Sequence, residues 1–198
     1  MTMTLKTEYR RFLRKKRRDI NLKQQGKASA AVVKIIFSSV EFSKSQKIAV
    51  YLAEENEIDL SSLIQRSLKL GKEIYLPVLD RHQKNVMQFY AYYEDCPLVL
   101  NRCNILEPIQ QRDKMIDVKK LDLVLLPLVG FDRLGNRLGR GGGYYDSAFH
   151  FCQRQKKGRP TLMGAAYEFQ CCDHLPTNEK DVSLDIAVTE ENTYYFKR

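Results

Sequence analysis

The segment from residue 126 to residue 146 constrains the fold more than any other part of the sequence. It begins inside an apolar run, residues 121–129, that is typical of a buried strand, and a turn is expected over residues 132–136. Residues 139–143 lie immediately before a helical pattern, and four of these five are glycines: Gly139, Gly141, Gly142 and Gly143. Such a loop lets backbone N–H groups approach an anion, and the N-terminus of the following helix adds positive potential. The segment therefore predicts an anion site at a strand-to-helix junction.

Strand-like and helical patterns alternate along the rest of the chain. Apolar residues at three-to-four spacing predict one or two helices over residues 5–37. Further helices are expected over residues 60–70 and 144–155, and strands over residues 47–52, 73–79, 87–92, 121–129, 161–167 and 185–189. This alternation predicts a three-layer α/β/α domain with a largely parallel sheet. The 198 residues fit one such domain, residues 1–198.

Basic residues are concentrated at the N-terminus. Residues 1–27 hold ten Lys or Arg against two acidic residues, whereas the other 171 residues hold 23 against 22. Lys6, Arg10 and Arg14 fall at helical spacing and make one row. This charge predicts an anionic partner, which is a nucleotide, a nucleic acid or an import receptor. No apolar run approaches the ~20 residues of a membrane span, and no secretory signal is expected. We expect a cytoplasmic protein, with an Arg-rich mitochondrial presequence as the open alternative.

Side chains around the glycine loop suit a polyphosphate. Arg137 and Arg140 offer planar forks of donors that match phosphate oxygens, with a solvated surface pair as the alternative. Asp146 would repel phosphates unless a cation lay between them, so it is predicted to bind Mg²⁺; complementing the helix dipole is the alternative. One of Tyr144 and Tyr145 is expected in the core and the other against a flat heterocycle. The loop matches neither a Walker A loop nor a dinucleotide fingerprint.

The segment Arg137-Leu-Gly-Arg-Gly-Gly-Gly-Tyr-Tyr-Asp146 after Leu-Pro-Leu-Val-Gly-Phe-Asp132 resembles the signature of the 5-formyltetrahydrofolate cyclo-ligase (5,10-methenyltetrahydrofolate synthetase) family. The resemblance covers most of the chain and is least specific over residues 80–120 and the last ten. Its other motifs are Lys6-x-x-x-Arg10, Tyr51-Leu-Ala-Glu-Glu-Asn-Glu57-Ile, Ile74-Tyr-Leu-Pro77 and Asn178-Glu-Lys-Asp181-x-x-x-Asp185. It implies a fold shared with some sugar-phosphate isomerases and CoA transferases.

The resemblance implies a reaction in which ATP and 5-formyltetrahydrofolate, with or without a polyglutamate tail, give ADP, phosphate and 5,10-methenyltetrahydrofolate. The γ-phosphate would activate the formyl oxygen, N10 would close the ring, and phosphate would leave. This chemistry depends on positioning and charge stabilisation.

The resemblance also assigns ligands. ATP would contact Lys6, Arg10, Arg137, Leu138, Gly139, Arg140, Gly141, Gly142, Gly143, Tyr144 and Tyr145. The folate would contact residues 140–144 together with Leu52 and Glu57, whose carboxylate would accept hydrogen bonds from the pterin ring. Arg140 would stabilise the transferring phosphoryl group and Tyr144 would orient the formyl end. Mg²⁺ would bind Asp146 and Asp181, with a surface-loop residue as the alternative for Asp181.

Two rival functions stay open. A nucleic-acid-binding module would use the basic N-terminal helix for phosphate contacts, but only Tyr9 and Phe12 could stack on bases there. The other rival keeps the nucleotide site and phosphorylates a different acid, formamide or phosphate acceptor. We expect the folate reaction, carried out by a monomer without a nucleic-acid or membrane partner.

Overall fold

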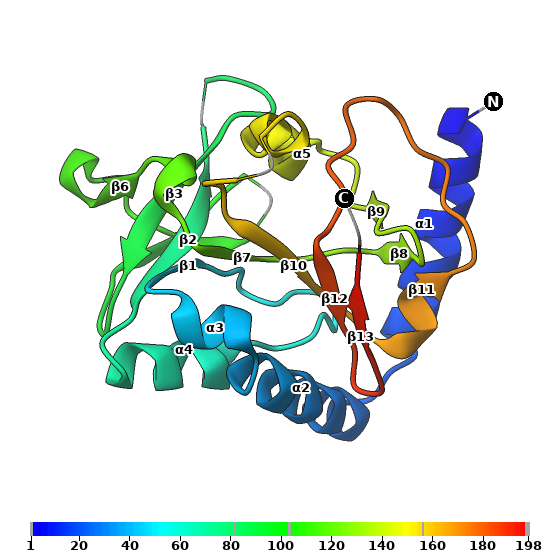
Figure 1. Cartoon of the computed structure of the whole chain (residues 1–198), viewed down its shortest axis with the longest axis horizontal. Coiled ribbons are helices and arrows are strands. Elements are labelled where there is room, and N and C mark those ends of the chain that lie inside the picture. The colour runs from blue at the N-terminus through cyan, green and yellow to red at the C-terminus, as the bar shows by residue number, and fades with distance from the viewer. Residues whose placement is uncertain (1, 81, 103, 156, 197–198) are drawn as a thin grey trace.

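The computed structural model describes residues 2–80, 82–102, 104–155 and 157–196 (Figure 1). No helix in this part of the chain is long and apolar enough to cross a membrane. The α-helices are α1 (Thr2–Arg18), α2 (Leu22–Phe37), α3 (Val40–Lys44), α4 (Ser61–Lys69) and α5 (Tyr144–Ala148). Residues 5–37, which were expected to form one or two helices, lie in two long helices, α1 and α2. A capping box between Asn21 and Gln24 marks the start of α2.

A central eight-stranded sheet runs in the order β13-β12-β10-β7-β1-β2-β3-β6. The pairs from β12 to β2 are parallel, and the edge pairs β12–β13, β2–β3 and β3–β6 are antiparallel. The prediction of an α/β fold with a largely parallel sheet is confirmed. Its strands are β1 (Lys47–Ala49), β2 (Glu73–Leu79), β3 (Met87–Tyr92), β6 (Met115–Ile116), β7 (Leu123–Leu126), β10 (Thr161–Ala165), β12 (Ile186–Val188) and β13 (Thr193–Tyr195).

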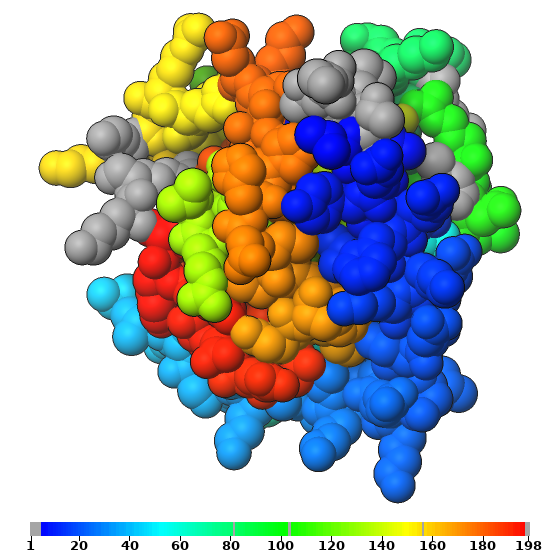
Figure 2. Space-filling model, turned by 90° about the vertical axis from the view of Figure 1, so that its right-hand side faces the viewer, coloured from blue at the N-terminus to red at the C-terminus, as the bar shows by residue number. Residues whose placement is uncertain are grey.

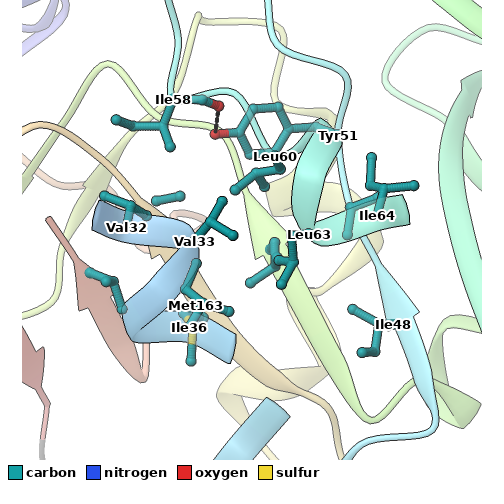
Figure 3. Packing of buried hydrophobic residues seen from close by; sticks show 14 of the residues in the cluster. Val32, Val33, Ile36, Ile48, Tyr51, Ile58, Leu60, Leu63, Ile64 and Met163 are labelled. Carbon is teal, nitrogen blue, oxygen red and sulfur yellow. Dashed lines mark hydrogen bonds between the residues drawn. The ribbon is translucent and has the colours of Figure 1, made fainter. Parts of the chain in front are cut away.

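Alternate residues of the central strands pack into separate cores on the two faces of the sheet. Ile48 and Leu123 face one core, whereas Ala49 and Val124 face the other. Helices α2, α3 and α4 cover the first face (Figure 1). Figure 3 shows side chains of α2 and α4 converging on Ile48 and Met163 in that layer.

The helical layer on the opposite face is thin. Helix α5 has five residues and is followed by a 3₁₀ helix, His150–Gln153, so the single helix expected over residues 144–155 is wrong in extent. The break lies at Phe149, whose backbone leaves the α conformation and whose side chain is fully buried. Because a five-residue helix aligns few peptide dipoles, the expected dipole contribution to anion binding is small.

A three-stranded sheet, in the order β11-β8-β9, connects α1 to the main body. Its strands are β8 (Gly130–Asp132), β9 (Arg137–Leu138) and β11 (Cys171–Cys172). Leu13 of α1 packs on Leu138 and Leu175 in a small core, and Figure 2 shows α1 (blue) lying along the segment that follows β11 (orange). The expected turn at residues 132–136 joins β8 to β9. Two strands outside both sheets, β4 (Leu98–Leu100) and β5 (Leu106–Pro108), form a hairpin.

Candidate functional site

A cavity of about 550 Å³ opens where β1 and β7 end. The carboxyl ends of parallel strands are the usual ligand position in open α/β sheets. Every residue to which the sequence assigned a ligand lies in its wall: Lys6, Arg10, Leu52, Glu57, Arg137, Leu138, Gly139, Arg140, Gly141, Gly142, Gly143, Tyr144, Tyr145, Asp146 and Asp181. Segments separated by more than a hundred residues thus meet in one place.

Sequence reasoning missed the apolar part of the wall. Strand β2 contributes Leu76, Pro77 and Leu79, and residues 80–120, for which no role was expected, also contribute side chains. The other wall residues that were missed are Thr7, Tyr51, Glu54, Met87, Asn101, Ile105, Leu106, Pro127 and Asn178. An apolar strand pattern does not distinguish residues that face a core from residues that face a cavity. The Ile74–Pro77 motif of the family resemblance was therefore the one sequence feature that pointed to this wall.

The β4–β5 hairpin is fixed to the sheet by a buried carboxylate. Glu107 Oε2 accepts hydrogen bonds from the Leu79 backbone N–H at 3.1 Å and from Asn101 Nδ2 at 3.0 Å. Ionised carboxylates make strong bonds of this kind with N–H donors. Glu107 therefore holds the hairpin, with Ile105 and Leu106, at the edge of the cavity.

The basic row of α1 divides between the cavity and the surface. Lys6 forms an ion pair with Asp181, and Arg10 Nε donates to the carbonyl oxygen of Gly139 at 2.8 Å. Burial lowers the pKa of Arg10, although the carboxylates of Asp181 and Asp146 act in the opposite direction. Arg14 instead donates to both oxygens of Glu55, at 2.6 and 2.7 Å, and does not line the cavity.

The glycine loop adopts a backbone that residues with a side chain adopt only with strain. Gly141 has φ +107°, and a Cβ built on it would lie 3.5 Å from Cζ of Arg10. A Cβ on Gly142 would lie 2.8 Å from the ring of Tyr144. These glycines allow the loop to pass close to α1 and to Tyr144, beside the cavity.

Arg137 and Asp146 form a largely buried ion pair beneath the loop. Arg137 Nη2 donates to Asp146 Oδ1 at 2.6 Å, and the Arg137 side chain is 3% exposed. The same Asp146 oxygen accepts a bond of 3.0 Å from the backbone N–H of Val182. Arg137 is therefore no solvated surface residue, and Asp146 lies next to the segment that carries Asp181.

The two aspartates fit a Mg²⁺ site of the kind that nucleotides complete. Among the described residues, no three His, Cys, Asp or Glu side chains gather as a metal-binding group. Mg²⁺ bound with a nucleotide, however, commonly takes one or two carboxylates, phosphate oxygens and water. Asp146 and Asp181 both line the cavity and both act electrostatically on Arg10. The donor set thus suits a metal that arrives with phosphates, rather than an ion held by protein alone.

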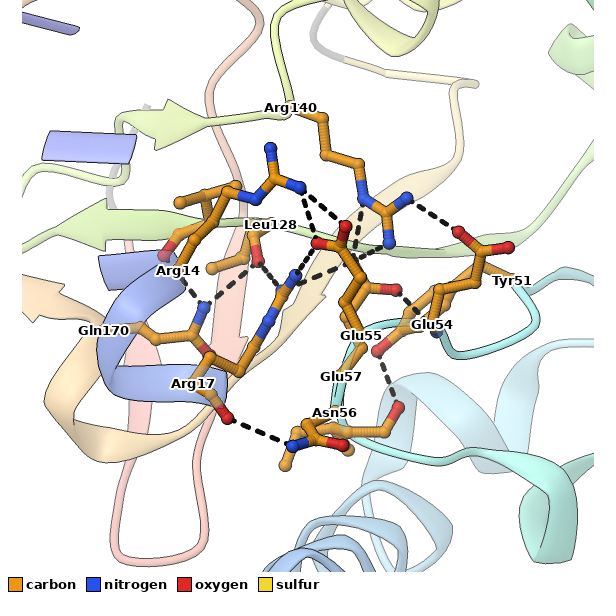
Figure 4. Close-up of polar contacts among 12 residues, drawn as sticks. Arg14, Arg17, Tyr51, Glu54, Glu55, Asn56, Glu57, Leu128, Arg140 and Gln170 are labelled. Carbon is orange, nitrogen blue, oxygen red and sulfur yellow. Dashed lines mark hydrogen bonds and ion pairs between the residues drawn. The ribbon is translucent and has the colours of Figure 1, made fainter. Parts of the chain in front are cut away.

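Arg140 lies on the cavity wall between two glutamates (Figure 4). Its Nη1 donates to Glu54 Oε2 at 2.8 Å, while Nη2 and Nε donate to Glu57 Oε1 at 3.0 and 3.2 Å. Burial acts to lower the pKa of Arg140, but Glu57 and Glu54 outweigh it and the pKa is raised. The guanidinium is therefore a permanent cation whose partners are side chains of the cavity wall.

The two tyrosines after the loop differ in environment. The Tyr145 ring packs with Phe89 and Phe149, and burial raises the pKa of its hydroxyl. The Tyr144 hydroxyl accepts a hydrogen bond of 2.8 Å from Arg102, a residue that sequence reasoning also missed. Tyr145 is thus the packing aromatic, and Tyr144 has its hydroxyl available to polar partners.

Comparison with known proteins identifies relatives across nearly the whole chain. The model of the 5-formyltetrahydrofolate cyclo-ligase family matches residues 2–190. A 5-formyltetrahydrofolate cyclo-ligase of Haemophilus influenzae is 35% identical over 189 residues, covering 95% of this chain and 100% of that protein. The Escherichia coli K12 protein of the same name is 31% identical, covering 92% and 99%. The solved structure of Aquifex aeolicus 5,10-methenyltetrahydrofolate synthetase superposes with a TM-score of 0.82 at 31% identity, covering 98% and 94%.

Proposed function

The chain belongs to the 5-formyltetrahydrofolate cyclo-ligase family, and from this premise we propose that it converts 5-formyltetrahydrofolate to 5,10-methenyltetrahydrofolate with ATP. One observation supports this most strongly. The family-signature residues, which come from both ends and the middle of the chain, line a single cavity of about 550 Å³. The nucleic-acid alternative is not supported by these relatives.

Formamide oxygen is a poor leaving group, which defines the task of the site. The formyl oxygen attacks the γ-phosphorus of ATP, and the bond between that phosphorus and ADP breaks. N10 then attacks the formyl carbon and loses its proton, and the carbon–oxygen bond breaks to release phosphate. Positioning the reactants and stabilising phosphoryl charge supply most of the catalysis in such transfers.

The nucleotide end of the cavity is assigned to Lys6 and Arg10, the two members of the basic row that line it, and to the glycine loop. Lys6 and Arg10 contribute cations from α1, and residues 137–145 contribute backbone N–H groups and side chains. Because Arg137 is already paired with Asp146, its contribution is to hold that carboxylate in place. Mg²⁺ would bind Asp146, Asp181 and the phosphates, where it would neutralise developing charge.

The folate end is assigned to Leu52, Glu57 and the apolar wall. The cavity wall offers apolar contact from Leu76 and Pro77 and a nearly buried carboxylate, Glu57, whose side chain is 5% exposed. An acceptor of this kind suits the N–H groups of a pterin ring. Arg140 and Tyr144 also line the cavity, and we assign the phosphoryl and formyl groups to them. We also propose that residues 1–198 form a single catalytic domain, which the family match over residues 2–190 supports.

The test is turnover of the purified protein. Incubation with 5-formyltetrahydrofolate and MgATP is expected to produce the near-ultraviolet absorbance of the methenyl product, with none when ATP is omitted. Chelation with EDTA is expected to stop the reaction and added Mg²⁺ to restore it. Asp146→Asn and Arg140→Ala, verified as folded by circular dichroism, are expected to abolish it. A folded wild-type protein without product would refute the assignment.

A further inference from the structure

Arg17 is a buried cation that lies outside the cavity. It is 2% exposed, the lowest value among the charged residues that the structure describes except Asp132, and it does not line the cavity wall. Its Nη1 donates to Glu57 Oε1 at 3.3 Å and to the carbonyl oxygen of Leu128 at 3.4 Å, and its Nη2 donates to Glu55 at 3.4 Å. Removing a guanidinium from water is costly, so its position beside Glu57 calls for an explanation.

Glu57 lies between two arginines (Figure 4). Its Oε1 accepts from Arg17 on one side and from Arg140 on the other, and its Oε2 accepts from the Glu54 backbone N–H at 3.2 Å. The two arginines differ in access to ligands, because the Arg140 side chain is 32% exposed and lines the cavity, whereas that of Arg17 is 2% exposed behind it.

The segment that carries Glu57 is also tied to the end of α1. Asn56, in a left-handed conformation with φ +59°, donates from Nδ2 to the carbonyl oxygens of Arg17 at 3.3 Å and Ile20 at 2.9 Å. The Leu128 carbonyl that Arg17 reaches also accepts from Gln170 Nε2 at 3.1 Å. Backbone and side chain therefore both hold Arg17 against Glu57.

The proposed reaction requires Arg140 to serve two partners. When Arg140 turns to the transferring phosphoryl group, Glu57 loses two hydrogen bonds and the nearer of its counter-charges. A buried carboxylate without a partner is strongly unfavourable. The Arg17 contact is unaffected by this movement, because Arg17 lies outside the cavity.

We propose that Arg17 is a positioning residue that acts through Glu57. It supplies a fixed counter-charge that holds the Glu57 carboxylate in place and oriented toward the folate while Arg140 is free to leave. This inference rests on the proposed function, since it takes Glu57 as the folate acceptor. A purely structural ion pair would instead affect protein stability, and its loss would weaken the binding of both substrates to the same extent.

The test measures the dissociation constants of the two substrates separately by equilibrium dialysis. Binding of 5-formyltetrahydrofolate is measured without ATP, and binding of MgATP is measured without the folate. In Arg17→Met the dissociation constant for the folate is expected to rise about tenfold or more, with that for MgATP within about twofold of wild type. Arg17→Lys keeps the charge but replaces the forked guanidinium by a single ammonium group. The dissociation constant for the folate is therefore expected to rise about three- to fivefold. Arg14→Gln, one turn earlier on α1 with a solvent-exposed Glu55 partner, is the matched control and should leave both constants unchanged.

A double-mutant cycle with Glu57→Gln decides whether Arg17 acts through Glu57. Arg17→Met should cause no further loss of folate binding in the Glu57→Gln background. If Arg17→Met does not fold, the same cycle with Arg17→Lys applies. Three results would each overturn the proposal. They are equal losses of affinity for folate and MgATP, an unchanged affinity for folate, and a loss of folate affinity on Arg17→Met that persists in the Glu57→Gln background. Wild-type protein that fails to bind 5-formyltetrahydrofolate would instead refute the function on which it rests.

Discussion

Replacing Asp132 by alanine should destabilise the protein severely although Asp132 does not line the cavity. Its carboxylate is fully buried and accepts from the backbone N–H groups of Leu134, Asn136 and Leu175 at 3.0, 2.9 and 3.0 Å. Leu175 is buried, so losing its acceptor costs about 1–3 kcal/mol, and each of the two turn N–H groups adds about 1 kcal/mol. The total of about 3–5 kcal/mol is a large part of a typical folding free energy of about 5–15 kcal/mol.

The free energy of unfolding of Asp132→Ala would be measured by urea titration with circular dichroism. Asp132→Asn retains an oxygen for the turn but presents an amide to the Leu175 N–H, so a smaller loss of about 1–3 kcal/mol is expected. Asp113→Asn is the control, because the Asp113 side chain is 74% exposed and its loss should cost under about 0.5 kcal/mol. Asp132→Ala with a midpoint and slope like those of wild type would refute this reasoning.

Two further predictions concern the loop and the pH dependence of stability. Gly141→Ala places a side chain at φ +107° beside Arg10, a strain of about 1–3 kcal/mol that should raise KM for MgATP about fivefold or more. Gly26→Ala in α2, where a Cβ meets nothing within 4 Å, should leave KM unchanged and stabilise the fold by about 0.5–1 kcal/mol; equal KM values for the two variants would contradict the loop's role. Burial raises the pKa of Glu190, so the proton that Glu190 binds favours the folded state at low pH and this contribution is lost as pH rises through the folded-state pKa. Urea titrations should therefore show Glu190→Gln stabilising the protein at pH 7 and not at pH 4, whereas the same effect at both pH values would count against this explanation.

Periodicity in the sequence predicted the central sheet well and the smaller elements poorly. The strands expected at residues 73–79 and 87–92 have those bounds in β2 and β3. The helix expected over residues 144–155 was too long, because the apolar spacing continues past the break at Phe149, a core residue, into the 3₁₀ helix His150–Gln153. Strands β4, β5, β9 and β11 have two or three residues each, and such short strands depend on tertiary pairing that a local pattern does not record.

The candidate site was predictable where a residue type is unusual in its context. Glycines in succession and carboxylates beside them stand out in the sequence, and all of the assigned positions line the cavity. Arg17 was not predictable as a partner of Glu57, because it is one of ten basic residues in the first 27 and burial alone distinguishes it. The apolar wall has the composition of an ordinary core strand and was missed for that reason.

The central claim is that ATP cleavage and ring closure are coupled in one cavity. The most direct measurement follows phosphate release and methenyl absorbance together in one reaction of wild-type protein with 5-formyltetrahydrofolate and MgATP. Our account predicts that phosphate and methenyl product appear in equimolar amounts at every time point, and that neither appears without the folate. Phosphate released in the absence of folate, or well in excess of the methenyl product, would contradict it.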